Sequence, residues 1–223
     1  HATGGHTSVV NVVAVRIGQA GCSGPQLSLL LAESRLDPAA ALGSIGHGPG
    51  PMPGPVNFRG VRIGIPICED IWGPEPAECI AETGGEILLV PNGSPYRRGV
   101  VDQRLSVAVG RVKDTGLPLV YLNQTGGQDE LVFEGASFVL NGDGSLAAQL
   151  PAFAEAIVTT HWTRKADGWH CAPAKIAPLE PQDKSDYTAC MLGLRDYVGK
   201  NGFPGVVLGL SGGVDSALVA AIG

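Results

Sequence analysis

Between residues 61 and 162, short runs of aliphatic and β-branched residues alternate with helical patterns, and this alternation is what most limits the possible folds. The strand-like runs occupy residues 61–67, 86–91, 117–124 and 154–162. Residues 74–85 and 101–112 have the patterns of helices, and residues 134–150 predict a hairpin with its turn at 141–144. The apolar face of the second helix is formed by Val101, Leu105, Ala108, Val109 and Val112. Strands that alternate with helices and then form hairpins predict an α/β domain with mixed sheets.

The chain on either side of this region has a different character. Residues 7–18 and 24–36 predict a strand and a helix, before a Gly/Pro stretch at 46–55 that cannot be regular structure. After a polar, proline-rich stretch, residues 186–202 predict a helix and residues 206–210 a buried strand. We therefore expect a divergent N-terminal segment, a first domain, a linker and the start of a second domain, at residues 1–50, 51–162, 163–185 and 186–223.

The composition argues against several classes of protein. The formal net charge is −6, and Lys and Arg form no block, so neither a nucleic-acid surface nor an anionic membrane surface is expected. The apolar runs near the start are too short to span a bilayer. The five cysteines are odd in number and include no C-x-x-C pair, so we expect neither a disulfide framework nor a zinc site. The reducing cytoplasm is the expected compartment.

The motif SGGVDS, residues 211–216, stands between the predicted strand 206–210 and a helix that begins near Asp215. Gly212 and Gly213 let the backbone turn sharply and bring N–H groups to an anion, which the positive end of the helix also attracts. Asp215 would repel a phosphate directly, but not if it holds Mg²⁺ between itself and the phosphates. The motif predicts a phosphate site, and a glycine-rich turn with a capping aspartate is the alternative.

GLSGGVDS, residues 209–216, resembles the pyrophosphate-binding loop of the N-type ATP pyrophosphatases. The helix and strand before it resemble the start of the synthetase domain of the NAD⁺ synthetases. This resemblance implies the first helix, strand and loop of a Rossmann-like domain, in which the loop binds ATP and Asp215 holds Mg²⁺. The residues implied to contact ATP are Gly209, Leu210, Ser211, Gly212, Gly213, Val214, Asp215 and Ser216.

Cys68, in IPICEDIWGP, stands where a predicted buried strand ends and the chain heads for a helix. A thiol on such a turn can be exposed, and a nearby helix N-terminus would lower its pKa and raise the thiolate fraction. A thiolate that attacks an amide carbonyl forms a thioester and releases ammonia. A buried structural cysteine is the alternative that the residue alone leaves open. The other four cysteines lack this setting.

Residues 53–96, which include IPICEDIWGP and NGSPY, and residues 116–150 resemble the amidase domain of glutamine-dependent NAD⁺ synthetases, of the nitrilase superfamily. The resemblance implies an α-β-β-α sandwich, with Cys68 as nucleophile and Ser94 as a glutamine contact. It implies that hydrolysis of L-glutamine supplies ammonia for the ATP-dependent amidation of deamido-NAD⁺ to NAD⁺. It also implies a homo-oligomer when the protein is intact.

The chain departs from this family in places. The first lysine is Lys113, whereas the family's catalytic lysine lies upstream of the cysteine, and Glu33 is the only glutamate of residues 1–50 but lacks the family's motif. Val100 stands where relatives carry a basic residue that contacts glutamine. A reading-frame error or fusion upstream of residue 50, which the abrupt composition change favours, competes with a degenerate domain. Without the lysine we expect little glutamine turnover by the chain as given.

Three functional hypotheses follow. The leading one is a fragment of a glutamine-dependent NAD⁺ synthetase, a C–N ligase, cut within its synthetase domain. The second is a stand-alone nitrilase-type amidohydrolase with an unrelated glycine-rich tail. The third is a non-catalytic remnant that lacks the triad lysine. Glutaminase activity without ATP binding would support the second, and a Cys68 that is silent towards glutamine analogues would support the third.

Overall fold

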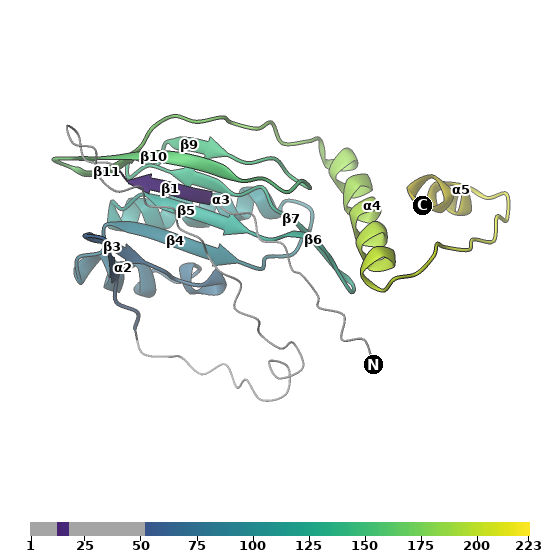
Figure 1. Cartoon of the computed structure of the whole chain (residues 1–223), viewed down its shortest axis with the longest axis horizontal. Coiled ribbons are helices and arrows are strands. Elements are labelled where there is room, and N and C mark those ends of the chain that lie inside the picture. Colours follow the sequence, from purple (N-terminus) through teal and green to yellow (C-terminus); the bar gives the residue numbers. More distant parts are fainter. Residues whose placement is uncertain (1–12, 18–51) are drawn as a thin grey trace.

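A six-stranded sheet forms the centre of the protein in a computed structural model that describes residues 13–17 and 52–223 (Figure 1). Its strands, in spatial order, are β2 (Val56–Phe58), β3 (Val61–Gly64), β4 (Ile87–Asn92), β5 (Leu119–Asn123), β8 (Phe138–Leu140) and β9 (Leu146–Gln149). β3, β4 and β5 are parallel, and the strands outside them pair antiparallel. The mixed α/β fold predicted from the sequence is confirmed.

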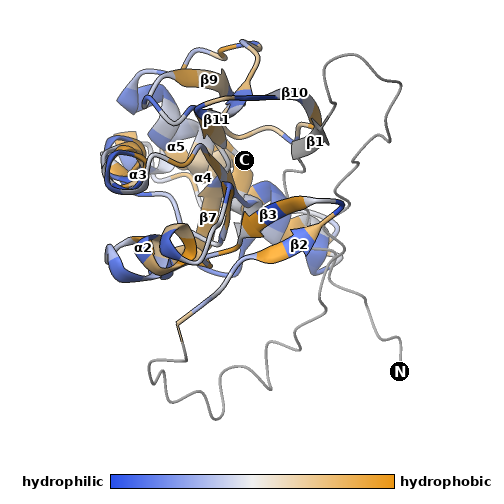
Figure 2. Ribbon diagram, turned by 90° about the vertical axis from the view of Figure 1, so that its left-hand side faces the viewer, coloured by the Kyte–Doolittle hydropathy of each residue, from blue (hydrophilic) through white to orange (hydrophobic). Residues whose placement is uncertain are grey.

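Two helices, α2 (Glu75–Glu82) and α3 (Val100–Thr115), make the crossovers between the parallel strands and cover one face of the sheet (Figure 2). The buried positions of α3 are Val100, Arg104, Ala108 and Val112, four residues apart, and Gly116 ends the helix with a positive φ of 69°. The predicted apolar face included Val101 and Leu105, so its position was shifted by about one residue. Ala108 and Val112 of the predicted face are buried, and Leu105 and Val109 pack against the core, but hydrophobic periodicity did not find Arg104 because a buried arginine is not apolar.

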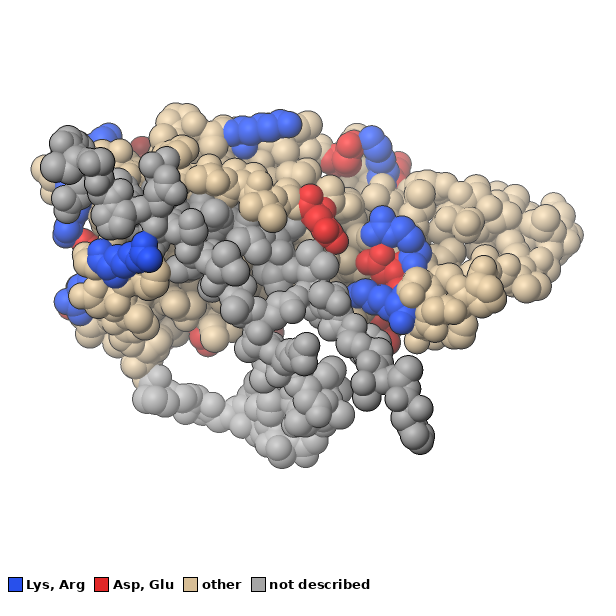
Figure 3. Space-filling view, viewed as in Figure 1, with Lys and Arg blue, Asp and Glu red and all other residues tan. Residues whose placement is uncertain are grey.

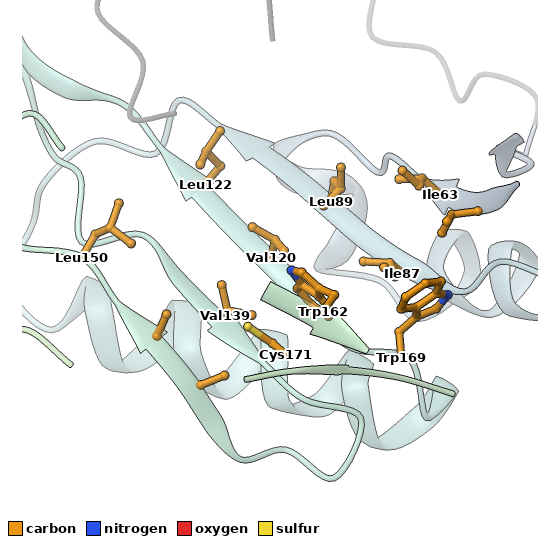
Figure 4. Packing of buried hydrophobic residues seen from close by; sticks show 13 residues of the cluster. Ile63, Ile87, Leu89, Val120, Leu122, Val139, Leu150, Trp162, Trp169 and Cys171 are labelled. Atoms are coloured by element: carbon orange, nitrogen blue, oxygen red, sulfur yellow. The ribbon is translucent and has the colours of Figure 1, made fainter. Parts of the chain in front are cut away.

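A second, smaller sheet covers the other face, and its strands in spatial order are β1 (Val13–Ile17), β10 (Val158–Lys165) and β11 (Gly168–Cys171). β1 runs parallel to β10 with Val13 opposite Val158, which confirms a strand in the part of 7–18 that the structure describes. The helix expected at 24–36 lies outside the described residues. Figure 4 shows Trp162 and Trp169 turned towards the aliphatic side chains of the six-stranded sheet. The described part of the chain thus has three layers, helix, sheet and sheet.

The linker expected at 163–185 contains a strand, so that expectation was wrong for residues 168–171. β11 pairs antiparallel with β10, and Trp169 and Cys171 are 4 % and 3 % exposed. The amide N–H of Cys171 donates to Asn141 Oδ1 at 2.8 Å, which ties β11 to the turn of the β8–β9 hairpin. The run looked irregular because its period-two alternation spans only four residues among prolines and charges.

A hairpin that the sequence analysis missed, β6 (Thr125–Gln128) and β7 (Leu131–Glu134), carries the long helix α4 (Gln182–Lys200). The backbones approach closely, because a Cβ added to Gly127 would lie 3.0 Å from the Cα of Gly193. The amide of Gly127 donates to Asp196 Oδ2 at 2.7 Å, and the ammonium of Lys200 donates to the Gly127 carbonyl at 2.5 Å. Small residues and charged hydrogen bonds thus seat α4 on the hairpin.

The C-terminal segment keeps the predicted loop and helix but not the predicted strand. α5 (Val214–Ile222) follows the glycines, whereas residues 206–210 form no strand and are exposed. None of the described strands lies beside them to pair with their N–H and C=O groups, so an extended ladder cannot form. On the face shown in Figure 3 this end of the molecule is free of charged side chains.

The remaining element predictions are confirmed, with the boundaries of β3, α2, β4, α3, β5, the β8–β9 hairpin, β10 and α4 shifted by a few residues. The turn at 141–144 closes with a hydrogen bond from the Gly144 amide to the Asn141 carbonyl at 2.8 Å. In the part of the chain that the structure describes, no helix combines the length and the apolar character needed to cross a membrane.

The correction at β11 can be tested with Trp169→Ala. Removing a buried indole leaves a cavity between the two sheets, and we expect a loss of about 3–5 kcal/mol in the free energy of unfolding. The matched control is Trp72→Ala, because Trp72 is 46 % exposed and should cost about 1 kcal/mol or less. Urea denaturation followed by far-UV circular dichroism measures both. Equal small losses would show that residues 168–171 behave as a linker.

Candidate active site

The turns that follow the three parallel strands meet at one edge of the six-stranded sheet. Cys68 comes after β3, Ser94 comes after β4, and Asn123 ends β5. The pairing of Asn92 with Asn123 brings the ends of β4 and β5 level. The carboxyl edge of parallel strands is where α/β sheets place their ligand sites, because the connecting turns converge there.

Cys68 occupies a sharp turn. Its φ is +51°, in the left-handed region that residues with a Cβ rarely adopt, and it begins the short 3-10 helix η1 (Cys68–Ile71). Asp70 fixes the turn, because its Oδ2 accepts the Ile67 amide at 2.8 Å and its own amide donates to the Ile67 carbonyl at 3.0 Å. A left-handed residue of this kind costs about 1–3 kcal/mol and persists only where its surroundings impose it. The prediction of a sharp turn at Cys68 is confirmed, and the thiol is partly exposed.

Ser94 is held from two sides. Asn123 takes both backbone groups, since its Oδ1 accepts the Ser94 amide at 3.0 Å and its Nδ2 donates to the Ser94 carbonyl at 3.1 Å. Arg104 takes the side chain and the same carbonyl, with Nε 2.9 Å from Ser94 Oγ and Nη2 2.7 Å from the carbonyl oxygen. The serine hydroxyl therefore has a fixed position at the sheet edge.

An ion pair is buried beneath this edge. Arg104 Nη1 contacts Glu134 Oε1, and the two side chains are 3 % and 1 % exposed. Burial raises the pKa of Glu134 above its ordinary value, while the charge and hydrogen bond of Arg104 oppose that rise. Glu134 Oε2 has no hydrogen-bond partner among the described residues.

Tyr121, on β5, links these groups. Burial raises the pKa of the Tyr121 phenol to about 12. The charge of Arg104 and a hydrogen bond with Ser94 lower this pKa, whereas the charges of Cys68 and Glu134 raise it. Its ring stacks on Phe138 with centroids 4.9 Å apart. Tyr121 thus lies among Cys68, Ser94 and the buried ion pair, which the sequence analysis had treated separately or missed.

The sequence analysis missed Tyr121, Asn123, Arg104 and Glu134. Their signal was weak, because Tyr121 and Asn123 belong to a buried strand and Arg104 lies outside the apolar face that periodicity predicted for the helix. A polar residue at a position expected to be buried was the available clue.

The predicted phosphate loop forms the start of α5. Gly212 is left-handed with φ +83°, and Gly213 caps the helix. Ser211 Oγ and Ser216 Oγ lie 3.1 Å apart, and Asp215 stands exposed in the first turn. Among the residues that the structure describes, no group of three His, Cys, Asp or Glu side chains could hold a metal. Asp215 is thus a single carboxylate beside two hydroxyls that hydrogen-bond to each other, and Ser216 Oγ also donates to the Gly213 carbonyl at 3.1 Å.

Other residues singled out in the sequence have different surroundings. Val100 is buried at the start of α3, Lys113 lies exposed in its last turn, and Glu33 lies outside the described residues. Cys171 is buried, which raises the pKa of its thiol to about 11. Cys79 is half-buried, Cys190 is exposed, and Cys22 is outside the described residues.

Helix α4 contacts the loop that carries Ser94. Asp186 accepts hydrogen bonds from the Tyr96 hydroxyl at 2.6 Å and from Arg98 Nε at 2.7 Å, and Gln182 Nε2 donates to the Tyr96 oxygen at 2.8 Å. Burial and the hydrogen bond to Asp186 raise the pKa of Tyr96 to about 12. The loop is therefore anchored by the sheet at one end and by α4 at the other.

A cavity of about 470 Å³ lies at the opposite edge of the sheet, among the turns that precede β4 and β5. Its lining includes Glu86, Pro118, Arg164 and Trp169, and none of the residues predicted for catalysis or ATP binding. The cavity and the Cys68 edge are therefore separate features of the molecule.

Two protein families match the chain. Residues 30–166 match the family described as carbon-nitrogen hydrolase, and residues 187–223 match the family described as NAD synthase. The first match begins at residue 30, within the segment 1–50 in which the sequence analysis found no resemblance.

Curated and solved relatives agree with these matches. The glutamine-dependent NAD(+) synthetase of Rhodobacter capsulatus is 55 % identical over 173 residues, which are 78 % of this chain and 31 % of that protein. The synthetase of Xanthomonas campestris is 42 % identical over 167 residues, 75 % of this chain and 30 % of that protein. The structure of glutamine-dependent NAD⁺ synthetase from Acinetobacter baumannii in complex with ADP superposes with a TM-score of 0.71 at 38 % identity, covering 78 % of this chain and 32 % of that one. The chain spans about a third of the length of the curated relatives.

The assignment of Cys68 can be tested by iodoacetamide labelling of the folded chain at pH 8 with mass-spectrometric mapping. We expect Cys68 to label faster than the other cysteines. Cys171 should stay unlabelled until the chain is unfolded, because a thiol with a pKa of about 11 is almost wholly protonated at that pH. Exposed Cys190 is the matched reference for simple accessibility. Slower labelling of Cys68 than of Cys190 would return Cys68 to a structural role.

Proposed function

This chain belongs to the carbon-nitrogen hydrolase family, and we propose that it carries the glutamine-hydrolysing site of a glutamine-dependent NAD⁺ synthetase. In this proposal L-glutamine, ATP and deamido-NAD⁺ are the substrates, and the ammonia set free from glutamine amidates deamido-NAD⁺ to NAD⁺. The observation that carries the proposal is the left-handed turn at Cys68 on the same sheet edge as Ser94, whose backbone is held by Asn123 and whose hydroxyl is held by Arg104.

Cys68 supplies the nucleophile in the proposed hydrolysis. Its thiolate sulfur attacks the amide carbon of glutamine, and backbone N–H groups after the nucleophile steady the negative oxygen of the tetrahedral intermediate. The carbon–nitrogen bond then breaks, the nitrogen takes up through solvent the proton that the Cys68 thiol lost on ionising, and ammonia leaves a γ-glutamyl thioester on Cys68. Water attacks the thioester carbon, and its hydrolysis releases glutamate and regenerates the thiol.

Ser94 orients the substrate in this proposal. Its backbone is fixed by Asn123 and its hydroxyl by Arg104, so the hydroxyl is positioned before glutamine arrives. A polar group that is already in place binds with less entropic cost than one that must be ordered.

The loop before α5 is proposed to bind ATP through residues 209–216, and the match of residues 187–223 to the NAD synthase family supports this. The exposed N-terminus of α5 and the hydroxyls of Ser211 and Ser216 suit phosphate oxygens. Asp215 is proposed to hold Mg²⁺, which neutralises phosphate charge when it is bound. The free thiols of the described residues support a reducing cytoplasm, and a homo-oligomer is proposed for the intact protein.

A stand-alone amidohydrolase is the second candidate, because residues of 61–134 alone build the Cys68 edge. Hydrolysis of glutamine in a chain that fails to bind ATP in any context would favour it. A Cys68 that does not react with glutamine-like electrophiles would favour a non-catalytic remnant instead.

The role of Ser94 can be tested with a chloroketone analogue of glutamine, which alkylates a thiol after it has bound like the substrate. We expect saturable alkylation of Cys68 that excess L-glutamine slows. Ser94→Ala should weaken analogue binding about tenfold, because one hydrogen bond to the substrate is lost. The matched control is Ser106→Ala, since Ser106 is exposed on α3. Equal effects of the two substitutions would contradict the role of Ser94.

The role of Asp215 can be tested in a chimera that continues this chain with the corresponding C-terminal region of the Rhodobacter capsulatus relative. We expect Asp215→Asn to reduce Mg²⁺-dependent ATP–pyrophosphate exchange by about a hundredfold or more, because the amide keeps the shape and loses the charge. Asp183→Asn, in the exposed first turn of α4, is the matched control. Exchange at the parental rate in Asp215→Asn would make Asp215 a helix-start residue only.

A further inference from the structure

We propose that the buried Arg104–Glu134 ion pair is the positioning element that presents the Ser94 hydroxyl to an acceptor oxygen of glutamine. This inference rests on the proposed function of the Cys68 edge and assigns a role to two residues outside its nucleophile. Neither residue contacts the reacting atoms, and both act through Ser94.

Arg104 uses every nitrogen of its guanidinium inside the protein. Nε donates to Ser94 Oγ at 2.9 Å, and Nη2 donates to the carbonyls of Ser94 and Pro95 at 2.7 and 3.1 Å. Nη1 contacts Glu134. Only an arginine offers these donors in one rigid plane, so the side chain fixes both the hydroxyl and the backbone of the loop at once.

The direction of these bonds sets what the Ser94 hydroxyl can do. Its oxygen accepts a hydrogen from Arg104, so its own proton is left to donate, and a substrate oxygen would take that proton in competition with the phenol oxygen of Tyr121, which hydrogen-bonds Ser94. Asn123 has already taken the amide of Ser94 and shares its carbonyl with Arg104. A fixed donor at the edge where Cys68 stands is suited to a carbonyl or carboxylate oxygen of the substrate.

Stability alone does not explain the ion pair. Two charges that are 3 % and 1 % exposed lose their hydration, and an apolar pair of the same volume is often equally or more stable. Glu134 moreover leaves Oε2 without a partner among the described residues. The pair gives the sheet edge something an apolar pair could not, which is a carboxylate that orients the guanidinium towards Ser94.

The test measures how the rate of alkylation of the full chain depends on the concentration of the chloroketone analogue of glutamine. This dependence separates the dissociation constant of the analogue from the rate constant of alkylation. Iodoacetamide labelling reports the intrinsic reactivity of Cys68. We expect Arg104→Lys to raise the dissociation constant of the analogue about tenfold or more, because the donor to Ser94 is lost. The alkylation rate constant and the iodoacetamide rate should stay within about twofold of the parent.

A double-mutant cycle distinguishes positioning from general loosening. In the Ser94→Ala background, Arg104→Lys should add no further change in the binding constant, because the pair acts through the hydroxyl. Arg111→Lys, on the same helix and paired with Asp114 at 3.1 Å, is the matched control and should bind the analogue like the parent. If Arg104→Lys fails to fold, the neutral double variant Arg104→Gln with Glu134→Gln avoids an unpaired buried charge and should show the same weakened binding.

The outcomes separate the two proposals. A parent chain that shows no saturable alkylation overturns the proposed function and this inference together. A parent that saturates, with an unchanged binding constant in Arg104→Lys or in the neutral double variant, overturns only the role of the ion pair. Additive effects of Ser94→Ala and Arg104→Lys would likewise show that Arg104 does not act through Ser94.

Discussion

The burial of β4 and β5 on both faces is the constraint on which the rest of the structure depends. Ile87 and Leu89 face the smaller sheet, which carries Trp162 and Trp169, while Leu88 and Val90 face the helices. A slip of one residue would move each set to the wrong layer, so the register of these strands is strongly specified. That register places the turns after β3, β4 and β5 at one edge, and it thereby brings Cys68, Ser94 and Asn123 together.

The chemistry of the site follows from how this edge satisfies its polar groups. Asn92 ties the end of β4 to β5, Asn123 ties the end of β5 to the loop that carries Ser94, and Arg104 ties α3 to the same loop. At the far end of the loop, Asp186 of α4 holds Tyr96 and Arg98. The regions that match carbon-nitrogen hydrolase and NAD synthase meet where Asp196 and Lys200 of α4 bind the β6–β7 hairpin, and Asp186, just before the second region, reaches the loop that carries Ser94.

Much of the fold could be predicted from the sequence, because the strands of the central sheet and their helices have clear periods. The strand end at Cys68 followed from the same periods, and the glycine loop at 211–216 followed from its motif between a predicted strand and a predicted helix. The features that were not predicted either have too short a hydrophobic period to recognise or interrupt a clear one. β11 alternates over only four residues, and Arg104 occupies a buried position on α3. The strand expected at 206–210 has the right composition, but composition cannot supply the neighbouring strand with which it must pair.

A crystal structure of Cys68→Ala soaked with L-glutamine tests the glutamine site most directly, because it needs no turnover. We predict glutamine at the carboxyl edge of β3, β4 and β5, with its amide carbon over the position of residue 68 and an oxygen within hydrogen-bond distance of Ser94 Oγ. Glutamine bound elsewhere, or an edge that stays empty at saturating glutamine, would contradict the assignment of Cys68 and Ser94 to one glutamine site.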